Sequence, residues 1–480
     1  MAFLIGGANS AADTAYEVAN SCRFNRPDSA YLNFSQGNGN RKDFTWSGWI
    51  KRSSSGLLQL IWHCNNAGHY SWLGFDSSDR LQYYSVDGST VQGSFVSTQV
   101  FRDQSAWYHI VARFEMSNAT EDNRIRFYVN GSEITVWTTK ASIPSQNTDL
   151  EMNVSGHTFR IGTYANSSDF VGMYMSEISF CDGQSYAPTS FGEFNSDSPT
   201  IWQPIDISGL TFGTNGFWLD FEDSSALGND VSGENNDFTP ANLAATDQSI
   251  DSPTNNFCTL NPLLKGSYIT LSEGNLVETG NTATDAGNVA CTFPMPGGGK
   301  WYFELKITAV SGSYPKIAVF HDFESVPQGT YNGGSGGSNM HPSGASGNAV
   351  STTVQYGSTT LENPTSNLTI TAPANGDTIQ FALDMDNGAI YVGVNGTFLN
   401  SGDPTSGASK TGKVADLTVT NQIMPMVSDY NGGATSWNFG SPNHSISSGN
   451  ADDNGYGNFE YDVPTGYFAL CSKNLGSDGG

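Results

Sequence analysis

Short stretches in which apolar and polar residues alternate recur through the first part of the chain, and turn residues separate them. They lie at residues 31–34, 44–51, 57–63, 70–75, 81–86, 107–116, 124–129, 159–164 and 171–180. Alternation with a period of two places the apolar side chains on one face of a β-strand. The pattern therefore predicts an antiparallel β-sandwich over residues 21–187.

A second series of short strands occupies the C-terminal part, at residues 299–305, 377–383 and 389–394. The pair Asn395-Gly396 follows this series, and Asn130-Gly131 follows a strand of the first one. Asn and Gly accept the positive φ that both central positions of a tight hairpin turn require, so each pair predicts a β-hairpin. We expect a second antiparallel sandwich over residues 258–480.

Between the two series, Asp, Asn, Ser, Gly and Pro dominate residues 213–262, apart from one strand-like stretch at 217–221. These residues favour turns because their side chains bond to nearby backbone or permit unusual φ values. We expect residues 188–257 to form an ordered but irregular connector rich in Asp and Asn.

The N-terminal segment, residues 1–20, precedes the first predicted strand. The stretch from Ser10 to Asp13 can cap a short helix that runs to about Asn20. A helix of this length is marginal alone, so we expect an arm that orders by docking on another protein. A frayed terminus is the alternative.

Composition agrees with an all-β chain, because only 14% of the residues are charged, 12% are aromatic, and Gly is abundant. The formal net charge is −26. Residues 1–160 carry 13 Lys and Arg against 14 Asp and Glu, residues 161–264 carry 14 acids and no Lys or Arg, and residues 265–480 carry 7 Lys against 18 acids. This balance argues against binding to nucleic acid.

The sequence gives no sign of export or of membrane insertion. No Lys or Arg precedes Arg23, so the positive region of a secretory signal is missing, and no apolar run has the length of a membrane span. We therefore expect synthesis in the cytoplasm. The single, scattered cysteines are expected to be buried free thiols: Cys22, Cys64, Cys181, Cys258, Cys291 and Cys471.

Five motifs of the first series resemble successive strands of laminin-G/concanavalin A-like lectin domains. They are WSGWIKR at 46–52, WYHIV at 107–111, RFYVNG at 126–131, FRIG at 159–162 and MSEISF at 175–180. In the second series, GKWYFELKI at 299–307, the stretch 376–398 and SWNFG at 436–440 resemble the SPRY domain. The resemblance implies two concanavalin A-like, jelly-roll sandwiches.

The order of arm, laminin-G-like unit, connector and SPRY-like unit resembles structural proteins of tailed bacteriophages, called tail fibre or receptor-binding proteins. The connector motif FWLDFEDSSALGNDVSG at 217–233 carries most of this likeness. It implies a homo-oligomeric, non-enzymatic virion protein, made in the host cytoplasm without a signal peptide. The arm would bind other virion proteins, and a sandwich would bind a host surface glycan or protein.

Three other functions stay open. A capsid-surface fibre or decoration protein would also be a non-enzymatic virion component. A polysaccharide depolymerase would need two carboxylates that face each other across a groove. A secreted bacterial adhesin would need the export signal that is not seen.

Gly333–Gly337 matches a G-x-S-x-G nucleophile elbow, but it lies in a Gly/Ser tract without the required strand and helix. The nearest approach to paired carboxylates is the set Asp384, Asp386 and Asp429, of which Asp386-Asn387-Gly388 is better explained by hairpin turn chemistry. We therefore expect no enzyme and no catalytic residues.

Two stretches offer candidate ligand-binding residues. In the first module, His69, Tyr70 and Trp72, with His63, Asn65 and Asn66 nearby, combine ring faces and amides as a sugar site does, although Trp62 and Trp72 suit a core equally well. The set Trp62-His63-Cys64 with His69 lacks the ligands to complete a zinc site. In the second module, Tyr331 in the 328–348 insertion, with Tyr430 and Asn431, are candidate anchors.

A bacterial envelope is anionic, which favours approach by the near-neutral first module, but salt screens this effect. The 328–348 insertion favours the second module, residues 258–480, as the recognition unit. Finally, Asp230, Glu234 and Asp237 lie in an Asp/Asn-rich run whose hard oxygen atoms suit calcium. A network of Asx turns explains the same composition.

Overall fold

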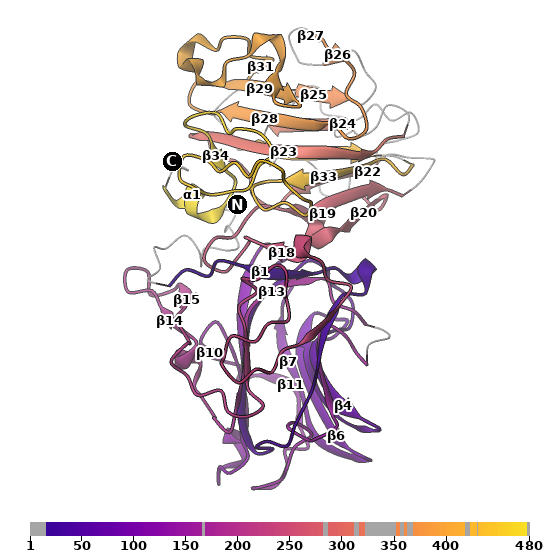
Figure 1. The fold of residues 1–480 in the computed structure, drawn as a ribbon, viewed down its shortest axis with the longest axis vertical. Helices are drawn as coiled ribbons and strands as arrows, with labels where there is room; N and C mark the ends of the chain where they lie inside the picture. The colour runs from indigo at the N-terminus through magenta and orange to yellow at the C-terminus, as the bar shows by residue number, and fades with distance from the viewer. Residues whose placement is uncertain are drawn as a thin grey trace. The chain divides into compact units, whose positions relative to one another are not determined.

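The computed structural model describes residues 16–165, 169–281, 287–311, 316–321, 352–355, 360–361, 368–417, 423–429 and 431–477. The chain divides into two compact units, Met1–Asn256 and Phe257–Gly480 (Figure 1). Both are built from antiparallel sheets, so the all-β prediction is confirmed. No helix in the described part of the chain is long and apolar enough to cross a membrane.

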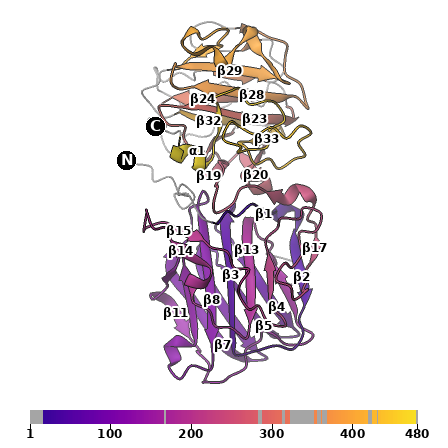
Figure 2. The same cartoon turned by 60° about the vertical axis from the view of Figure 1, so that its left-hand side comes forward.

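The first unit contains two eight-stranded sheets, here named sheet A and sheet B, which form its two layers (Figure 2). In spatial order, sheet A comprises β10 (Ser132–Glu133), β9 (Ile125–Val129), β8 (Trp107–Glu115), β3 (Asp43–Arg52), β13 (Met173–Asp182), β1 (Ser21–Phe24) and β18 (Gln248–Ser249), with β16 (Phe217–Leu219) also paired to β13. Sheet B comprises β11 (Trp137–Ala141), β7 (Thr90–Val100), β6 (Arg80–Asp87), β5 (His69–Phe75), β4 (Gln59–Asn66), β12 (Thr158–Ile161), β2 (Tyr31–Ser35) and β17 (Thr239–Ala241).

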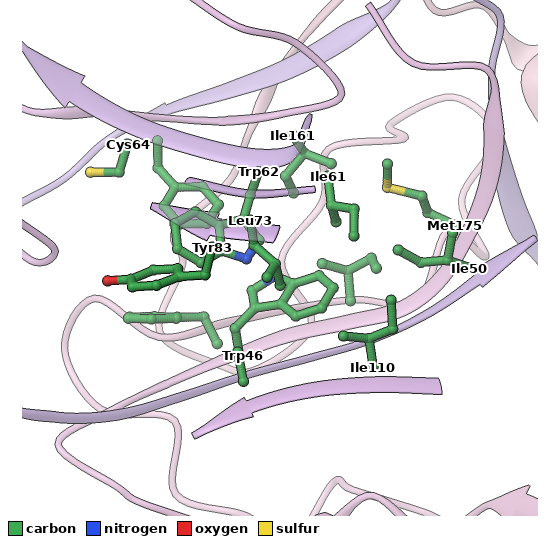
Figure 3. Close-up of a cluster of buried hydrophobic side chains, with 14 of the residues drawn as sticks. Trp46, Ile50, Ile61, Trp62, Cys64, Leu73, Tyr83, Ile110, Ile161 and Met175 are labelled. Carbon is green, nitrogen blue, oxygen red and sulfur yellow. The ribbon is translucent and has the colours of Figure 1, made fainter. Parts of the chain in front are cut away.

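The core of the first unit lies between these sheets (Figure 3). Trp46 and Ile50 come from β3 of sheet A, and Trp62 and Tyr83 come from sheet B; each is at most 1% exposed. The alternating pattern of the sequence thus gives each sheet one apolar face. Burial of these large side chains is the main stabilising contribution in the unit.

Residues 188–256 are not a connector between the two units, because they belong to the first one. Strand β16 pairs with β13, β17 pairs with β2, and β18 pairs with β1. Phe217 and Phe238 enter the core, where their rings meet edge to face with centroids 4.8 Å apart. The sequence shows the strand-like stretch that forms β16, but most other apolar residues of the segment are isolated among turn residues. Phe238, for example, fills a gap in the core without belonging to a strand.

The returning segment also supplies carboxylates to buried cations of sheet A. Lys51 Nζ lies 2.7 Å from Asp251 Oδ2, and Arg23 Nη2 lies 3.2 Å from Asp247 Oδ1. The side chains of Lys51 and Asp251 are 1% and 2% exposed. Trp107 Nε1 donates to the other oxygen of Asp251 at 3.1 Å. Burying a charge without a partner is costly, so these pairs tie the segment to the sheet.

The helix expected up to Asn20 does not form over residues 16–20, and residues 1–15 lie outside the described part of the chain. Residues 16–20 lead into β1 and bond to the sandwich instead. The amide of Val18 donates to Thr254 Oγ1 at 3.0 Å, and Ser176 Oγ donates to the Asn20 carbonyl at 2.7 Å. These contacts with distant residues outweigh the weak local preference for a short helix.

The second unit also has its core between two sheets. One comprises β19 (Leu260–Lys265), β22 (Gly287–Cys291), β32 (Ile423–Asp429), β24 (Lys316–His321) and β25 (Thr352–Gln355). The other comprises β20 (Ile269–Ser272), β21 (Val277–Gly280), β33 (Ala434–Asn438), β23 (Lys300–Ala309), β28 (Thr378–Asp384), β29 (Ala389–Val394) and β30 (Thr397–Phe398). Phe303 of β23 stacks on Phe381 of β28 with centroids 5.0 Å apart, and Val289 and Val427 join the cluster from the first sheet.

Shorter elements complete the two units. The remaining strands are β14 (Gly192–Phe194), β15 (Trp202–Pro204), β26 (Thr360–Leu361), β27 (Leu368–Thr369), β31 (Ala415–Asp416) and β34 (Phe468–Ala469), which pairs with β23 in parallel. One α-helical turn, α1, spans Ser472–Ser477. The short 3-10 helices are η2 (Arg26–Asp28), η3 (Glu121–Asn123), η4 (Pro188–Ser190), η5 (Ala245–Asp247), η6 (Glu273–Asn275), η8 (Leu399–Ser401) and η9 (Pro404–Ser409).

Two local predictions are confirmed. Asn130-Gly131 joins β9 to β10 with φ of 47° and 75°, and Asn395-Gly396 joins β29 to β30 with φ of 49° and 83°. Positive φ at both positions is the hairpin geometry that the Asn-Gly pair favours. The six cysteines are all buried and free.

The buried Lys51–Asp251 pair gives a prediction about stability. Replacing Asp251→Ala leaves the Lys51 ammonium with the Asn256 amide oxygen, 2.6 Å away, but without its counter-charge. We expect the free energy of unfolding of the first unit to fall by about 3–5 kcal/mol. Urea denaturation of the full chain, followed by tryptophan fluorescence, measures the loss.

The matched control is Asp122→Ala, which removes the partner of Lys140 in an exposed pair with Nζ 2.7 Å from Oδ1. Water solvates both ions there, so we expect no measurable change in stability. Equal effects of the two substitutions would contradict the role given to Asp251.

Candidate functional site

The outer face of sheet B gathers the predicted aromatic residues of the first unit. Trp62 and Cys64 of β4 lie in the core, so the residue between them, His63, lies on the opposite face. In the sheet register, His63 is opposite Trp72 of β5, and Trp72 is opposite Tyr84 of β6. Adjacent strands therefore place three rings side by side.

These rings contact one another. The centroid of Tyr84 lies 6.1 Å from Trp72 and 6.2 Å from Tyr70, and His63 lies 4.6 Å from Tyr164, which follows β12. The side chains of Tyr70, Trp72, Tyr84 and Tyr164 are partly exposed, whereas His63 is buried beneath them. We call these five residues the aromatic face. It presents amphipathic rings to solvent on a rigid sheet.

Two buried N–H donors lie beneath this face. His63 Nδ1 accepts a hydrogen bond from the Ala165 amide at 3.4 Å, so the proton of the neutral ring is on Nε2. Burial, followed by the nearby Arg160, lowers the pKa of His63 to about 3, which keeps the ring neutral. Within the described part of the chain, neither His63 Nε2 nor Arg160 Nε has a hydrogen-bond partner. A buried donor without an acceptor costs about 1–3 kcal/mol.

The structure separates the residues predicted for this site. Tyr70 and Trp72 are on the aromatic face, together with Asn65, whose amide oxygen accepts a hydrogen bond from Arg160 Nη1 at 2.5 Å. His69 is directed elsewhere, toward Asp87 and Glu151. Trp62 is a core residue stacked on Phe159, as the alternative interpretation held, whereas Trp72 is not.

Sequence reasoning missed Tyr84, Tyr164 and Arg160. Tyr84 has a signal, because it is out of phase with the buried Leu81 and Tyr83 of its own strand. Arg160 has none, since β12 reaches β4 by a pairing that is distant in sequence.

In the second unit, Tyr331 and Tyr430 lie outside the described residues. Asn431 is an exposed turn residue with a φ of 48°, a conformation that Asn adopts readily. Gly333–Gly337 also lies outside the described part. Asp384 accepts hydrogen bonds from the backbone and side chain of Asn387 at 2.9 and 2.8 Å, which is turn chemistry.

The three residues proposed for calcium do not gather as a metal-binding group. Asp230 Oδ1 accepts from the Trp218 amide at 2.9 Å, and its Oδ2 accepts from the Asn236 amide at 2.8 Å. Asp237 accepts from the Asp230 amide at 2.9 Å, and Glu234 is exposed. The Asx-turn interpretation therefore accounts for the run, because backbone amides occupy the oxygens that a cation would need.

A serine and a histidine lie together on sheet A beside a cavity of about 10 Å³ that Glu177 also lines. Trp202 Nε1 donates to His109 Nδ1 at 2.9 Å, so Nε2 carries the proton and donates to Ser47 Oγ at 2.8 Å. The ring therefore cannot accept the serine proton as a general base. Burial lowers the pKa of His109 to about 3, and the pair is a structural hydrogen bond.

Comparison with known proteins assigns the fold of the first unit. Residues 26–180 match the family described as the concanavalin A-like lectin/glucanases superfamily, laminin-G type. The chain carries a laminin-G/concanavalin A-like domain. None of the curated proteins compared with the chain matches it.

Solved structures similar to the chain include laminin-G and SPRY domains. The mouse laminin α1 domains LG4-5 share 11% identity over 89% of this chain and 92% of that one, with a TM-score of 0.29. The SPRY domain of human HERC1 shares 16% identity over 37% and 96%, with a TM-score of 0.25. A putative carbohydrate-binding protein from Bacteroides ovatus shares 14% identity over 47% and 58%, with a TM-score of 0.32.

Glu177, beside the cavity, gives a prediction about pH. Its φ is 51° at an irregularity in β13, and Trp218 Nε1 donates to its carboxyl at 3.0 Å. Burial raises the pKa of Glu177 to about 8 from an unfolded value of 4.5. The stabilising effect of the bound proton is thus complete below pH 4.5 and is lost as the pH rises through 8.

We expect the free energy of unfolding of Glu177→Gln to fall less than that of the unmodified chain between pH 5 and pH 9. Denaturation at both pH values measures the difference. The exposed Glu193→Gln serves as the control and should follow the unmodified chain. An identical pH dependence for Glu177→Gln and the unmodified chain would count against a buried, protonated Glu177.

Proposed function

We propose that this chain is a non-enzymatic recognition protein of a tailed-bacteriophage virion, a tail fibre or receptor-binding component that binds a glycan on the host surface through the aromatic face. The observation that carries the recognition part is the row of partly exposed rings of Tyr70, Trp72 and Tyr84 on adjacent strands of one sheet. The virion part rests on the resemblance of residues 217–233 and of the order of the units.

The chemistry of the face favours a sugar. The apolar C–H face of a pyranose packs on the rings of Trp72 and Tyr84, whose centroids are 6.1 Å apart. The Asn65 amide adds a polar group beside these rings, because Asn65 of β4 is opposite Tyr70 of β5 in the sheet register.

Two features favour a protein of a larger assembly. The acidic charge of −26 keeps the chain from binding nucleic acid or an anionic membrane unspecifically. Val18 joins the arm to the first unit, and we assign the binding of other virion proteins to residues 1–15, which precede it in the sequence. A homo-oligomer on the particle would multiply weak glycan contacts. A capsid-surface fibre or decoration protein remains the alternative of the same class.

The polysaccharide depolymerase is the alternative of another class. The His109 proton on Nε2 and the turn role of Asp384 both speak against catalytic use of these groups. Incubation of the purified chain with host capsular polysaccharide or lipopolysaccharide separates the two functions. Binding without shortening of the glycan is expected, and progressive shortening would establish the depolymerase.

The aromatic face gives a prediction about binding. We expect Trp72→Ala to weaken binding of the full chain to host glycan by roughly 10-fold to 100-fold, because one stacking ring contributes about 1–3 kcal/mol. Titration of the purified glycan by calorimetry measures the affinity. Phe194→Ala is the matched control, because Phe194 is 47% exposed and belongs to β14. A normal affinity for Trp72→Ala would reject the aromatic face as the site.

The same variant tests which unit recognises the cell. If Trp72→Ala loses the purified glycan but retains full binding to whole cells, recognition belongs to the second unit and its 328–348 insertion. Loss of both supports the first unit.

The arm gives a further prediction. Deletion of residues 1–15 should prevent incorporation of the chain into particles and leave the Val18 and Asn20 contacts with the first unit intact. Immunoblotting of purified particles measures incorporation, and the midpoint of thermal unfolding checks the fold. Normal incorporation of a folded, shortened chain would exclude the arm as the attachment segment.

A further inference from the structure

Three metal-ligating side chains, His69, Asp87 and Glu151, gather at one end of sheet B, and His157 lies beside Glu151. His69 begins β5 and Asp87 ends β6, and the loop before β12 supplies Glu151 and His157. His69 Nδ1 lies 2.8 Å from Asp87 Oδ1 and 3.9 Å from Glu151 Oε2. The ligand atoms of these three residues all lie within 4.8 Å of one another. His157 Nε2 lies 3.8 Å from the same Glu151 oxygen.

Glu151 is the unusual member of this cluster. Its side chain is 5% exposed, and Arg41 Nη2 donates to Oε1 at 2.9 Å. Within the described part of the chain, Oε2 has no hydrogen bond and lies near the two imidazole rings instead. Oε2 is therefore the oxygen of Glu151 that can ligate a cation shared with the two rings. Arg41 holds the carboxylate in this orientation, as an outer-shell partner of a metal ligand does.

The spacing suits a small metal ion. Two ligands bound at about 2.0–2.1 Å in a tetrahedral site lie about 3.3 Å from each other. The observed separations of 2.8, 3.8 and 3.9 Å lie on both sides of that value. Side-chain rotations that move these atoms by a few tenths of an ångström would bring them to bonding distance from one ion. The side chains of His69 and Asp87 are 44% and 47% exposed, so an ion can enter from solvent.

The kinds of ligand atom at the site determine which metals it suits. Two imidazole nitrogens with two carboxylate oxygens suit zinc and similar divalent transition metals, whereas calcium and magnesium prefer oxygen donors alone. The charges also balance, since two carboxylates face one divalent cation.

We propose that His69, Asp87 and Glu151, with His157 as the fourth ligand, form a binding site for a divalent transition metal of the zinc type. The ion joins the β4–β5 and β6–β7 hairpins to the loop before β12, and thereby stabilises this end of the sandwich. The site is independent of glycan recognition, because the aromatic face uses other side chains.

The test uses the full chain without an affinity tag, stripped of metals with a chelator. Zinc chloride is titrated by calorimetry, and the midpoint of thermal unfolding is measured with and without zinc, calcium or magnesium chloride. Binding of one zinc ion per chain and a higher midpoint with zinc alone are expected. Cobalt chloride should give the visible absorption of a cobalt ion of low coordination number.

The variants His69→Ala and Glu151→Gln should each weaken zinc binding at least about 10-fold. The matched control is His444→Ala in the second unit, which should bind zinc as the unmodified chain does. Circular dichroism without metal checks that each variant is folded, and Asp87→Asn replaces a variant that is not. Absence of zinc binding, or equal binding by the unmodified chain and a folded His69→Ala variant, would overturn the proposal and leave a simple His69–Asp87 ion pair.

Discussion

The first unit depends on carboxylates that reach buried cations from far along the chain. Arg23 of β1 and Lys51 of β3 lie inside the unit, and their partners Asp247 and Asp251 come from the returning segment. A buried cation without its partner would cost several kcal/mol, a large share of the stability of a typical domain. The sandwich and the segment therefore form one structure. Part of the run of acids without bases, residues 161–264, thus neutralises the basic residues that precede it.

Local pattern predicted the strands and the tight turns well, because both depend on neighbouring residues. The alternation in β3 and β4 and the Asn-Gly pairs are examples. Apart from the strand at 217–219, the pattern did not show that residues 188–256 belong to the first unit, because core residues such as Phe238 stand alone among turn formers. Their burial follows from the space that they fill between the two sheets, and that space depends on the whole fold.

The candidate site shows the same division. Tyr70 and Trp72 are two residues apart, so their shared face follows from strand periodicity alone. Arg160 joins them only because β12 lies between β4 and β2, an order that the sequence does not encode locally. The cluster of His69 with Glu151 likewise requires two chain segments to meet. Sequence reasoning dismissed a metal at His69 because it considered only nearby residues.

The long separation within the buried ion pairs also bears on how the protein forms during synthesis. Lys51 and Asp251 are 200 positions apart, and Arg23 and Asp247 are 224 apart. The ribosome makes the early strands first, and contacts between distant residues form slowly. The nascent strands therefore cannot complete the sandwich, and their cations remain hydrated, until the segment with Asp247 and Asp251 has left the ribosome. The first unit therefore reaches its native state only after Asp251 has been translated.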